Sequence, residues 1–178
     1  MDHLRLIEED LRNLGLECQR KYPEVGEASQ KALDSLKVVR ETYVNSLRKN
    51  VGSSESPKLP ESSDIVSPYI LLCNHADCSS KLISQALSGL QSLLTYGVVP
   101  VSEVQNVVRV LSIQAVGGKS DSHLRVIQIL VGLATLTVRD GAAFRQFSDQ
   151  TVGALLSALL VFCEARHGAA VVSAASGS

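Results

Sequence analysis

The amino-acid sequence predicts an all-α fold, an armadillo/HEAT-like α-solenoid of about six or seven helices in antiparallel pairs. Apolar residues recur at spacings of three and four in several separate stretches, which is typical of helices with one buried face. Pro23, Gly97 and Gly117 fall between these stretches and end one helix before the next begins. A closed helical bundle would show the same features, and periodicity alone does not separate the two arrangements.

The first two helices are predicted on either side of a break at Tyr22-Pro23. The residue before a proline is disfavoured in the helical region, whereas proline itself suits the first turn of a helix. The apolar stripe before the break contains Leu4, Ile7, Leu11, Leu14 and Cys18. The stripe after it contains Val25, Ala28, Ala32, Leu36, Val39, Tyr43 and Leu47. So short a break between two long stripes predicts an antiparallel helix hairpin.

Residues 51–64 are predicted to form a flexible loop. Their sequence, VGSSESPKLPESSD, is rich in serine and contains two prolines. A segment of this composition cannot bury enough apolar area to offset the entropy that ordering would cost. We therefore expect a surface excursion between the first hairpin and the remaining helices.

Five further helices are predicted from the same spacing. They cover residues 65–73, 82–94, 101–111, 120–138 and 152–163. The segment 101–111 is rich in valine, but its apolar steps fit a helix better than the alternation of a strand. The segment 120–138 is apolar nearly all round, which predicts a central buried helix.

Composition narrows the function classes. Seventeen Lys and Arg residues against eighteen Asp and Glu residues give a net charge of -1, which argues against a nucleic-acid or anionic-membrane footprint spread over the chain. Residues 100–178 are poor in charge, so we expect them to pack against more chain or against a partner. The charged start without a signal peptide and the four cysteines predict a cytoplasmic protein with reduced thiols.

Two short motifs could carry chemistry, but each has a simpler interpretation. The Cys73–Cys78 segment, CNHADC, lacks the spacing and the fourth ligand of a zinc site, so a turn in which Asp77 caps the next helix is favoured. The VGGKS segment at 116–120 resembles the tail of a phosphate-binding loop, but Ile113 stands where that motif needs glycine. A glycine-rich helix terminator is favoured there, with Ser120 or Asp121 capping the next helix.

No nucleophile elbow and no HExxH pattern occurs in the sequence. We therefore predict no catalytic residues, no metal site and no cofactor, and the chain is not expected to be an enzyme. The remaining candidate is a small basic surface with one aromatic side chain, formed by Arg20, Lys21, Tyr22, Arg48 and Lys49. Such a surface would contact an acidic partner or an anionic membrane. The favoured alternative is that these cations end two helices and complement their dipoles.

Four stretches also carry a family resemblance. They are DLRNLGLECQRKYPEV at 10–25, KLISQALSGLQSLLTYGVV at 81–99, the apolar helix at 124–136, and ALLVFCEARHGAAVVSAA at 158–175. In this order they resemble the N-terminal DCB (dimerisation and cyclophilin-binding) domain of the Mon-two and large Arf guanine-nucleotide exchange factor family, with Mon-two the nearer branch. The first match is fairly specific, and the other three are general helix patterns.

The resemblance implies a non-catalytic protein-interaction and self-association domain of a Golgi and endosome trafficking scaffold. It implies that residues 1–178 form one domain, an N-terminal fragment of a much longer protein that is peripheral at trans-Golgi and endosomal membranes. The implied partners are another copy, the downstream helical segment, and Arf-like GTPases or trafficking adaptors, with no nucleic acid. The alternatives are the regulatory domain of a large Arf exchange factor and an unrelated armadillo-type adaptor.

Overall fold

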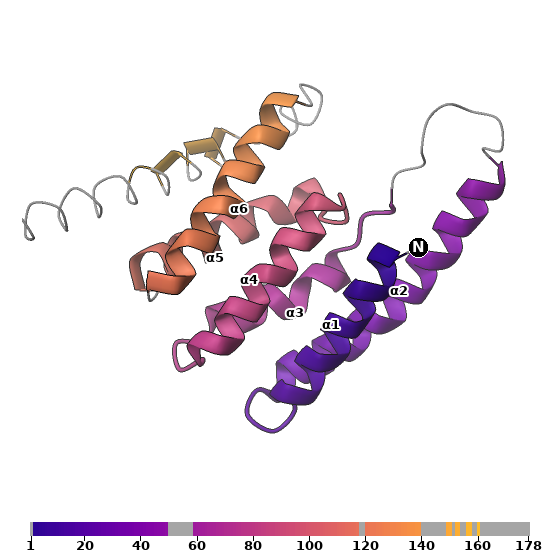
Figure 1. The fold of residues 1–178 in the computed structure, drawn as a ribbon, viewed down its shortest axis with the longest axis horizontal. Helices are drawn as coiled ribbons and strands as arrows, with labels where there is room; N and C mark the ends of the chain where they lie inside the picture. Colours follow the sequence, from indigo (N-terminus) through magenta and orange to yellow (C-terminus); the bar gives the residue numbers. More distant parts are fainter. Residues whose placement is uncertain are drawn as a thin grey trace, which may run out of the picture. The chain divides into compact units, whose positions relative to one another are not determined.

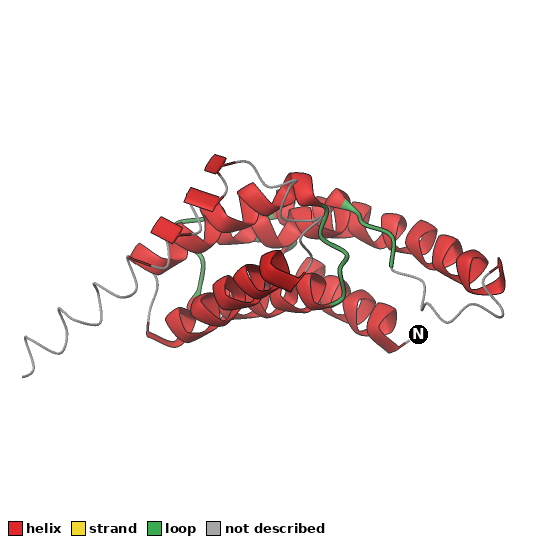
Figure 2. Ribbon diagram, turned by 90° about the horizontal axis from the view of Figure 1, so that it is seen from above, coloured by secondary structure: helices red, strands yellow, loops and turns green. Residues whose placement is uncertain are grey.

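In the computed structural model, the described residues are 2–49, 59–117 and 120–139, with single positions between 149 and 160. The helices of the continuous segments are α1 (Asp2–Cys18), α2 (Pro23–Lys49), α3 (Ser63–Asn74), α4 (Ser80–Thr95), α5 (Val101–Gly117) and α6 (Ser120–Arg139). Within the described residues there is no strand (Figures 1 and 2), which confirms the all-α, solenoid-like class and the helical assignment of the valine-rich segment. Most of the helix predicted at 152–163, and residues 168–178, lie outside the described residues.

The chain divides into two compact units, Met1–Val104 and Gln105–Ser178. In the first unit α1 packs on α2, α2 on α3, α3 on α4, and α4 returns to contact α1. Short turns join α1 to α2 and α3 to α4, so each pair is an antiparallel hairpin (Figure 1). The four helices therefore form two layers, with α1 beside α4 in one and α2 beside α3 in the other.

The predicted stripe of α1 is buried along its whole length, from Leu4 to Cys18. In the stripe of α2, Val25, Ala32, Leu36 and Val39 are buried, Ala28 and Tyr43 are half-buried, and Leu47 is exposed. The reason is length: α2 has 27 residues and α1 has 17, so the last turns of α2 extend beyond the helix that covers them.

The helix α3 begins within the loop that the sequence predicts at 51–64. Ser63 and Asp64 form its first turn, so the helical boundary lies two residues earlier than expected. Asp64 is held there by α2, because its carboxylate accepts a hydrogen bond from Ser35 (2.9 Å) and pairs with Lys31 (2.8 Å). A carboxylate in the first turn of a helix is also stabilised by the helix dipole. Residues 51–58 lie outside the described residues.

The cap of α4 differs from the prediction. Ser79, not Asp77, precedes the helix, and its hydroxyl accepts a hydrogen bond from the backbone N–H of Leu82 (3.4 Å). Both residue types are good caps, and composition did not decide between two candidates two positions apart. In α6, Ser120 and Asp121 are already helical, so neither is the residue that precedes this helix.

The helix α6 is not buried all round. Val126, Ile129, Leu130 and Leu133 are buried, but Leu124 is 63% exposed and Val131 is 51% exposed. These two residues lie seven positions apart and therefore share one face of the helix. The apolar residues that led to the prediction of a central helix therefore lie on two faces of α6, one buried and one exposed.

The C-terminus of α4 ends in a left-handed turn at Gly97, whose φ is +69°. The N–H of Val98 donates to the carbonyl of Leu93 (3.0 Å), and the N–H of Gly97 donates to the carbonyl of Leu94 (3.1 Å). These two bonds define a Schellman motif, and the burial of Leu93 and Val98 supplies its usual apolar contact. The glycine predicted to end this helix does so by adopting a backbone conformation that other residues avoid.

Gly97→Ala is expected to lower the free energy of unfolding by about 1 kcal/mol, because L-alanine is disfavoured at positive φ. A Cβ at this position would meet no heavy atom within 4 Å, so the cost is conformational and not steric. Urea denaturation of the 178-residue chain measures the loss. Gly97→Asn should lose less, since asparagine tolerates the left-handed region, and equal losses for both variants would contradict this explanation.

Candidate functional site

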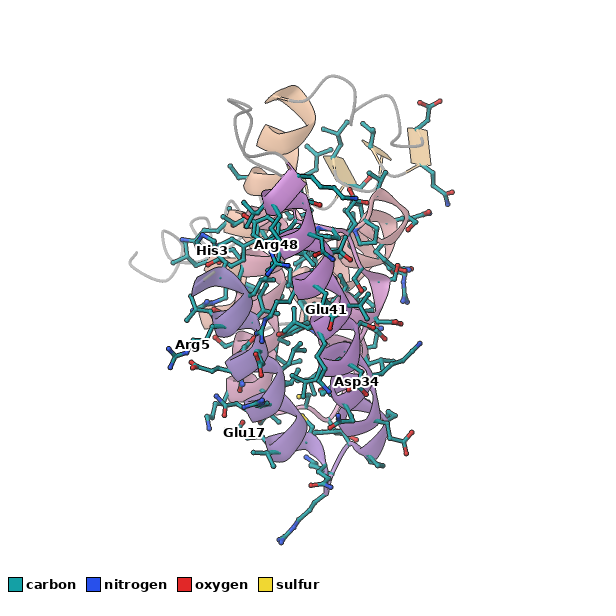
Figure 3. All side chains as sticks on the ribbon, turned by 90° about the vertical axis from the view of Figure 1, so that its right-hand side faces the viewer. His3, Arg5, Glu17, Asp34, Glu41 and Arg48 are labelled. Carbon is teal, nitrogen blue, oxygen red and sulfur yellow. The ribbon has the colours of Figure 1, made fainter. Side chains whose placement is uncertain are left out.

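The five residues of the predicted basic surface do not come together. Arg20 and Lys21 lie in the turn between α1 and α2, whereas Arg48 and Lys49 end α2. The length of α2 separates the two groups by about 38 Å, since each residue of a helix advances the chain by 1.5 Å. In Figure 3, Arg48 lies at the end of the hairpin opposite to Glu17, which is close to the turn. The structure therefore does not bring all five residues together on one surface, and a role of either group in binding stays a prediction.

Lys21 and Tyr22 instead join the α1–α2 turn to the loop between α3 and α4. Tyr22 is only 5% exposed, and its hydroxyl donates a hydrogen bond to the carbonyl of Asp77 (2.9 Å). The ammonium of Lys21 donates to the same carbonyl (3.3 Å). The ring of His75 stacks against Tyr22, and its Nε2 lies 2.7 Å from a carboxylate oxygen of Glu24. The aromatic member of the predicted surface therefore stabilises the fold.

Cys73 and Cys78, which belong to the candidate metal segment, and Cys18 are buried or half-buried thiols. Burial raises the pKa of Cys73 to about 12 and the pKa of Cys18 to about 11, and it also raises the pKa of Cys78. A protonated, buried thiol is a poor nucleophile and a poor metal ligand. Across the described segments, no group of three His, Cys, Asp or Glu side chains is placed to hold a metal ion.

A polar pair made of the buried Tyr69 and the half-buried Asp10 joins three helices of the first unit. The hydroxyl of Tyr69 on α3 donates a hydrogen bond to Oδ2 of Asp10 on α1 (2.8 Å). The Tyr69 ring lies against Gly89 on α4, where a Cβ would stand 2.7 Å from ring carbon Cδ1 and 2.8 Å from the Asp10 carboxylate. A cavity of about 190 Å³ opens beside the pair. One feature of the sequence points to this contact: a glycine inside a leucine-rich helix often has a packing reason.

Burial raises the pKa of the Asp10 carboxyl above its ordinary value of 3.8, and hydrogen bonds from Tyr69 and Gln85 offset part of the effect. Burial also raises the pKa of Tyr69 well above its ordinary value, and the nearby carboxylate raises it further. The native state therefore holds a proton on Asp10 more tightly than the unfolded chain does. Above the native pKa of Asp10, its ionised carboxylate lowers the free energy of unfolding. This destabilisation decreases as the pH falls and is absent below 3.8, where the carboxyl is protonated in both states.

Asp10→Asn is expected to keep the hydrogen bond from Tyr69, because an amide oxygen also accepts one, while removing the cost of the buried charge. The variant should be at least as stable as the parent at pH 7, and the difference should change in favour of the parent as the pH falls toward 3.8. Urea midpoints of both proteins at several pH values measure this trend. A difference that does not change with pH would show that Asp10 titrates normally.

The outer face of the first hairpin carries a groove between α1 and α2, which Figure 3 views from the front. The larger part has a volume of about 690 Å³ and is lined by Leu11, Arg12, Gly15, Leu16, Gln19, Pro23, Gly26, Glu27, Ser29, Gln30 and Leu33. The smaller part has a volume of about 280 Å³ and is lined by Glu8, Arg12, Gln30, Leu33, Leu36, Lys37 and Arg40. The two parts share Arg12, Gln30 and Leu33, so they form one continuous depression, which we call the α1/α2 groove.

Small residues explain why this groove is hollow. A Cβ on Gly15 would stand 3.2 Å from Cβ of Ser29, and one on Gly26 would stand 3.4 Å from Cα of Gln19. The two helices therefore approach closely at positions that carry almost no side chain. Leu16 lies at the edge of this hollow with 73% of its surface exposed. Sequence reasoning missed the groove because Leu16 lies off the apolar stripe of α1.

No helix within the described residues is long and apolar enough to cross a membrane. The described helices form two compact units, with exposed apolar side chains on one face of α6 and a groove between α1 and α2. Stacked helix hairpins with exposed apolar side chains form the class of helical interaction domains.

The particular family follows from comparison with known proteins. The family described as the Mon2/Sec7/BIG1-like dimerisation and cyclophilin-binding (DCB) domain matches residues 2–165, and the chain belongs to this family. The chain is 28% identical to the Protein MON2 homolog of Homo sapiens over 138 residues, which cover 76% of this chain and 7% of that protein. It is 26% identical over 136 residues to the Protein MON2 homolog of Xenopus laevis, covering 74% of this chain and 7% of that one.

The matched part of the chain thus spans about one fourteenth of the length of these curated relatives. No solved structure matches the chain. The resemblance to the DCB domain that the sequence predicts, with Mon-two as the nearer branch, is confirmed.

Proposed function

We propose that the chain is the non-catalytic self-association and protein-binding domain of a membrane-trafficking scaffold that is peripheral at trans-Golgi and endosomal membranes. The description of its family names dimerisation and cyclophilin binding, which supports an interaction domain. The observation that carries the proposal is the uncovered face of α6, where Leu124 and Val131 expose most of their surface. Large apolar side chains gathered on one helical face mark a protein interface.

The preferred partners are another copy of this domain and a helical segment that follows residue 178 in a longer chain. Both would bury the apolar surface that Leu124 and Val131 expose. Arf-like GTPases and trafficking adaptors come next. The regulatory domain of a large Arf exchange factor is the second candidate, because the family description includes the Sec7 and BIG1 relatives. An exchange domain downstream in the longer reading frame would select this second candidate.

Light scattering across a concentration series tests the proposal, using the 178-residue chain and a form extended past Ser178. We expect the average mass of the shorter chain to rise with concentration, or the extension to change this behaviour by covering the α6 face. Leu124→Ser combined with Val131→Ser should reduce the association. A monomer at all concentrations in both forms, with no binding to purified Golgi GTPases or adaptors, would contradict the proposal.

A further inference from the structure

We propose that the α1/α2 groove binds an amphipathic helix of a partner protein, one whose apolar face ends in acidic residues. The inference rests on the proposed function as a protein-binding domain, and it names the surface and the chemistry of one partner. The surface differs from the α6 face considered above, because it lies wholly within the first compact unit.

The first argument is the shape and the lining of the groove. Its floor is formed by Gly15, Gly26 and Ser29, whose small side chains leave the helix backbones nearly bare. Its edges include Leu16, which is largely exposed, and Leu33, which is half-buried. A hollow of about 690 Å³ is within the range of protein binding pockets, which are concave and mostly apolar. The apolar side chains of a second helix would fill it.

The second argument is charge. The narrower end of the groove is lined by three cations, Arg12, Lys37 and Arg40, against the single carboxylate of Glu8. Glu8 accepts hydrogen bonds from both arginines, with Arg12 at 2.6 Å, and these cations hold its pKa below the ordinary value. Asp34 pairs with Lys37, so the three cations face two carboxylates, and the excess positive charge at this end of the groove favours an anionic partner.

The cations also keep donors for a partner. A guanidinium has five N–H groups, and each arginine donates one hydrogen bond to Glu8. Lys37 pairs with Asp34 (2.8 Å), but both side chains are largely exposed, and such a surface pair contributes little and exchanges readily. Acidic side chains of a partner could therefore form bidentate contacts with the arginines without breaking a buried pair.

The third argument is the periodicity of the groove. On α2 its lining residues Gly26, Gln30, Leu33 and Lys37 step by four, three and four, as do Arg12, Leu16 and Gln19 on α1 by four and three. The lining residues of α2 run from Pro23 to Arg40, a stretch of about 26 Å, or nearly five helical turns. A partner helix of this length, with apolar residues at i, i+3, i+4 and i+7 over the wider part of the groove, would place its acidic end over Arg12 and Arg40. A flat lipid surface would not enter the hollow.

The experiment uses the 178-residue chain and a display library of helical peptides randomised on one face. We expect selected peptides to share apolar residues at i, i+3, i+4 and i+7, with Asp or Glu at one end. Fluorescence polarisation then measures the affinity of the leading peptide. Leu16→Lys should weaken binding at least about tenfold, and Arg12→Gln should weaken binding and reduce its dependence on salt.

Val38→Lys is the matched control, because Val38 is also an exposed apolar residue of the hairpin (62%) but does not line the groove. It should leave peptide affinity unchanged. Circular dichroism and the urea midpoint show whether each variant is folded, and none of the three replaces a buried residue.

Three outcomes would overturn the inference. The first is selection of peptides without acidic residues, or equal binding by the Leu16→Lys variant. The second is self-association of the chain that Leu16→Lys abolishes, which would make a second copy the occupant. The third is binding to vesicles containing anionic lipid that Leu16→Lys abolishes, with no peptide binding. The variant with both Leu124→Ser and Val131→Ser tests the two proposals independently. If it loses self-association but still binds the peptide, the groove and the α6 face are separate binding surfaces.

Discussion

Gly89→Ala is expected to lower the free energy of unfolding of the first unit by about 3 kcal/mol, at the upper end of the cost of overpacking a core. The added Cβ would overlap the Tyr69 ring and crowd the Asp10 carboxylate. The ring cannot turn away readily, because it is buried and its hydroxyl is bonded to Asp10. Urea denaturation followed by tyrosine fluorescence measures the loss, since tyrosines 22, 43, 69 and 96 all lie in the first unit.

Gly132→Ala is the control for this prediction. Gly132 also lies inside a helix, but a Cβ there would meet no heavy atom within 4 Å, so alanine should raise stability through its better helix propensity. Because Gly132 belongs to the second unit and all four tyrosines to the first, urea denaturation of this variant is followed by circular dichroism. Replacing Tyr69 by leucine should remove much of the penalty of Gly89→Ala, because the two changes share one contact. Additive losses in the double variant would show that the glycine does not make room for the ring.

Leu14→Ala is expected to cost about 3 kcal/mol, within the range for emptying a fully buried leucine site. Leu14 has no exposed surface and belongs to the stripe by which α1 packs in the first unit. Leu16→Ala, two positions along the same helix, removes the same atoms from a side chain that is 73% exposed. It should change the urea midpoint little, since few contacts are lost.

The comparison of the two leucines also separates stability from binding. Leu14→Ala should mainly lower the free energy of unfolding. Leu16→Ala should leave the fold intact and lower the affinity of the α1/α2 groove for its partner. A loss of several kcal/mol on replacing Leu16 would mean that its side chain is covered in solution, either by another copy or by residues outside the described segments.

The first hairpin could be predicted almost fully from the sequence because its information is local. The stripe from Leu4 to Cys18 follows from the helical period, and the break at Pro23 follows from the fixed geometry of proline. Both can be recognised from residues that are close together in the sequence. The same holds for Gly97, where a glycine after a leucine stripe is the ordinary sign of a helix end. The face of α6 was harder, since periodicity cannot distinguish an apolar side that is buried from one that is not.

The candidate functional sites could not be predicted in the same way, because they depend on contacts between residues far apart in the sequence. Tyr22 was predicted on a surface, but the loop after α3 covers it through the carbonyl of Asp77. Arg20 lies in the turn after α1 and Arg48 lies in the last turn of α2, so antiparallel pairing places them at opposite ends of the hairpin. The α1/α2 groove arises from glycines on two helices that meet only after folding. The spacing of residues within a single helix does not predict any of these contacts.

The contact of α1 with α4 joins the two hairpins of the first unit through a second pair of helices, besides α2 and α3. In stacked helical repeats, contacts of this kind between neighbouring hairpins couple the unfolding of one to that of the other. Here Asp10, Tyr69 and Gly89 meet from α1, α3 and α4, so no single hairpin completes the polar pair alone. The four helices should unfold in one cooperative transition. During synthesis the first hairpin must also wait until residue 89 has left the ribosome before Asp10 is enclosed.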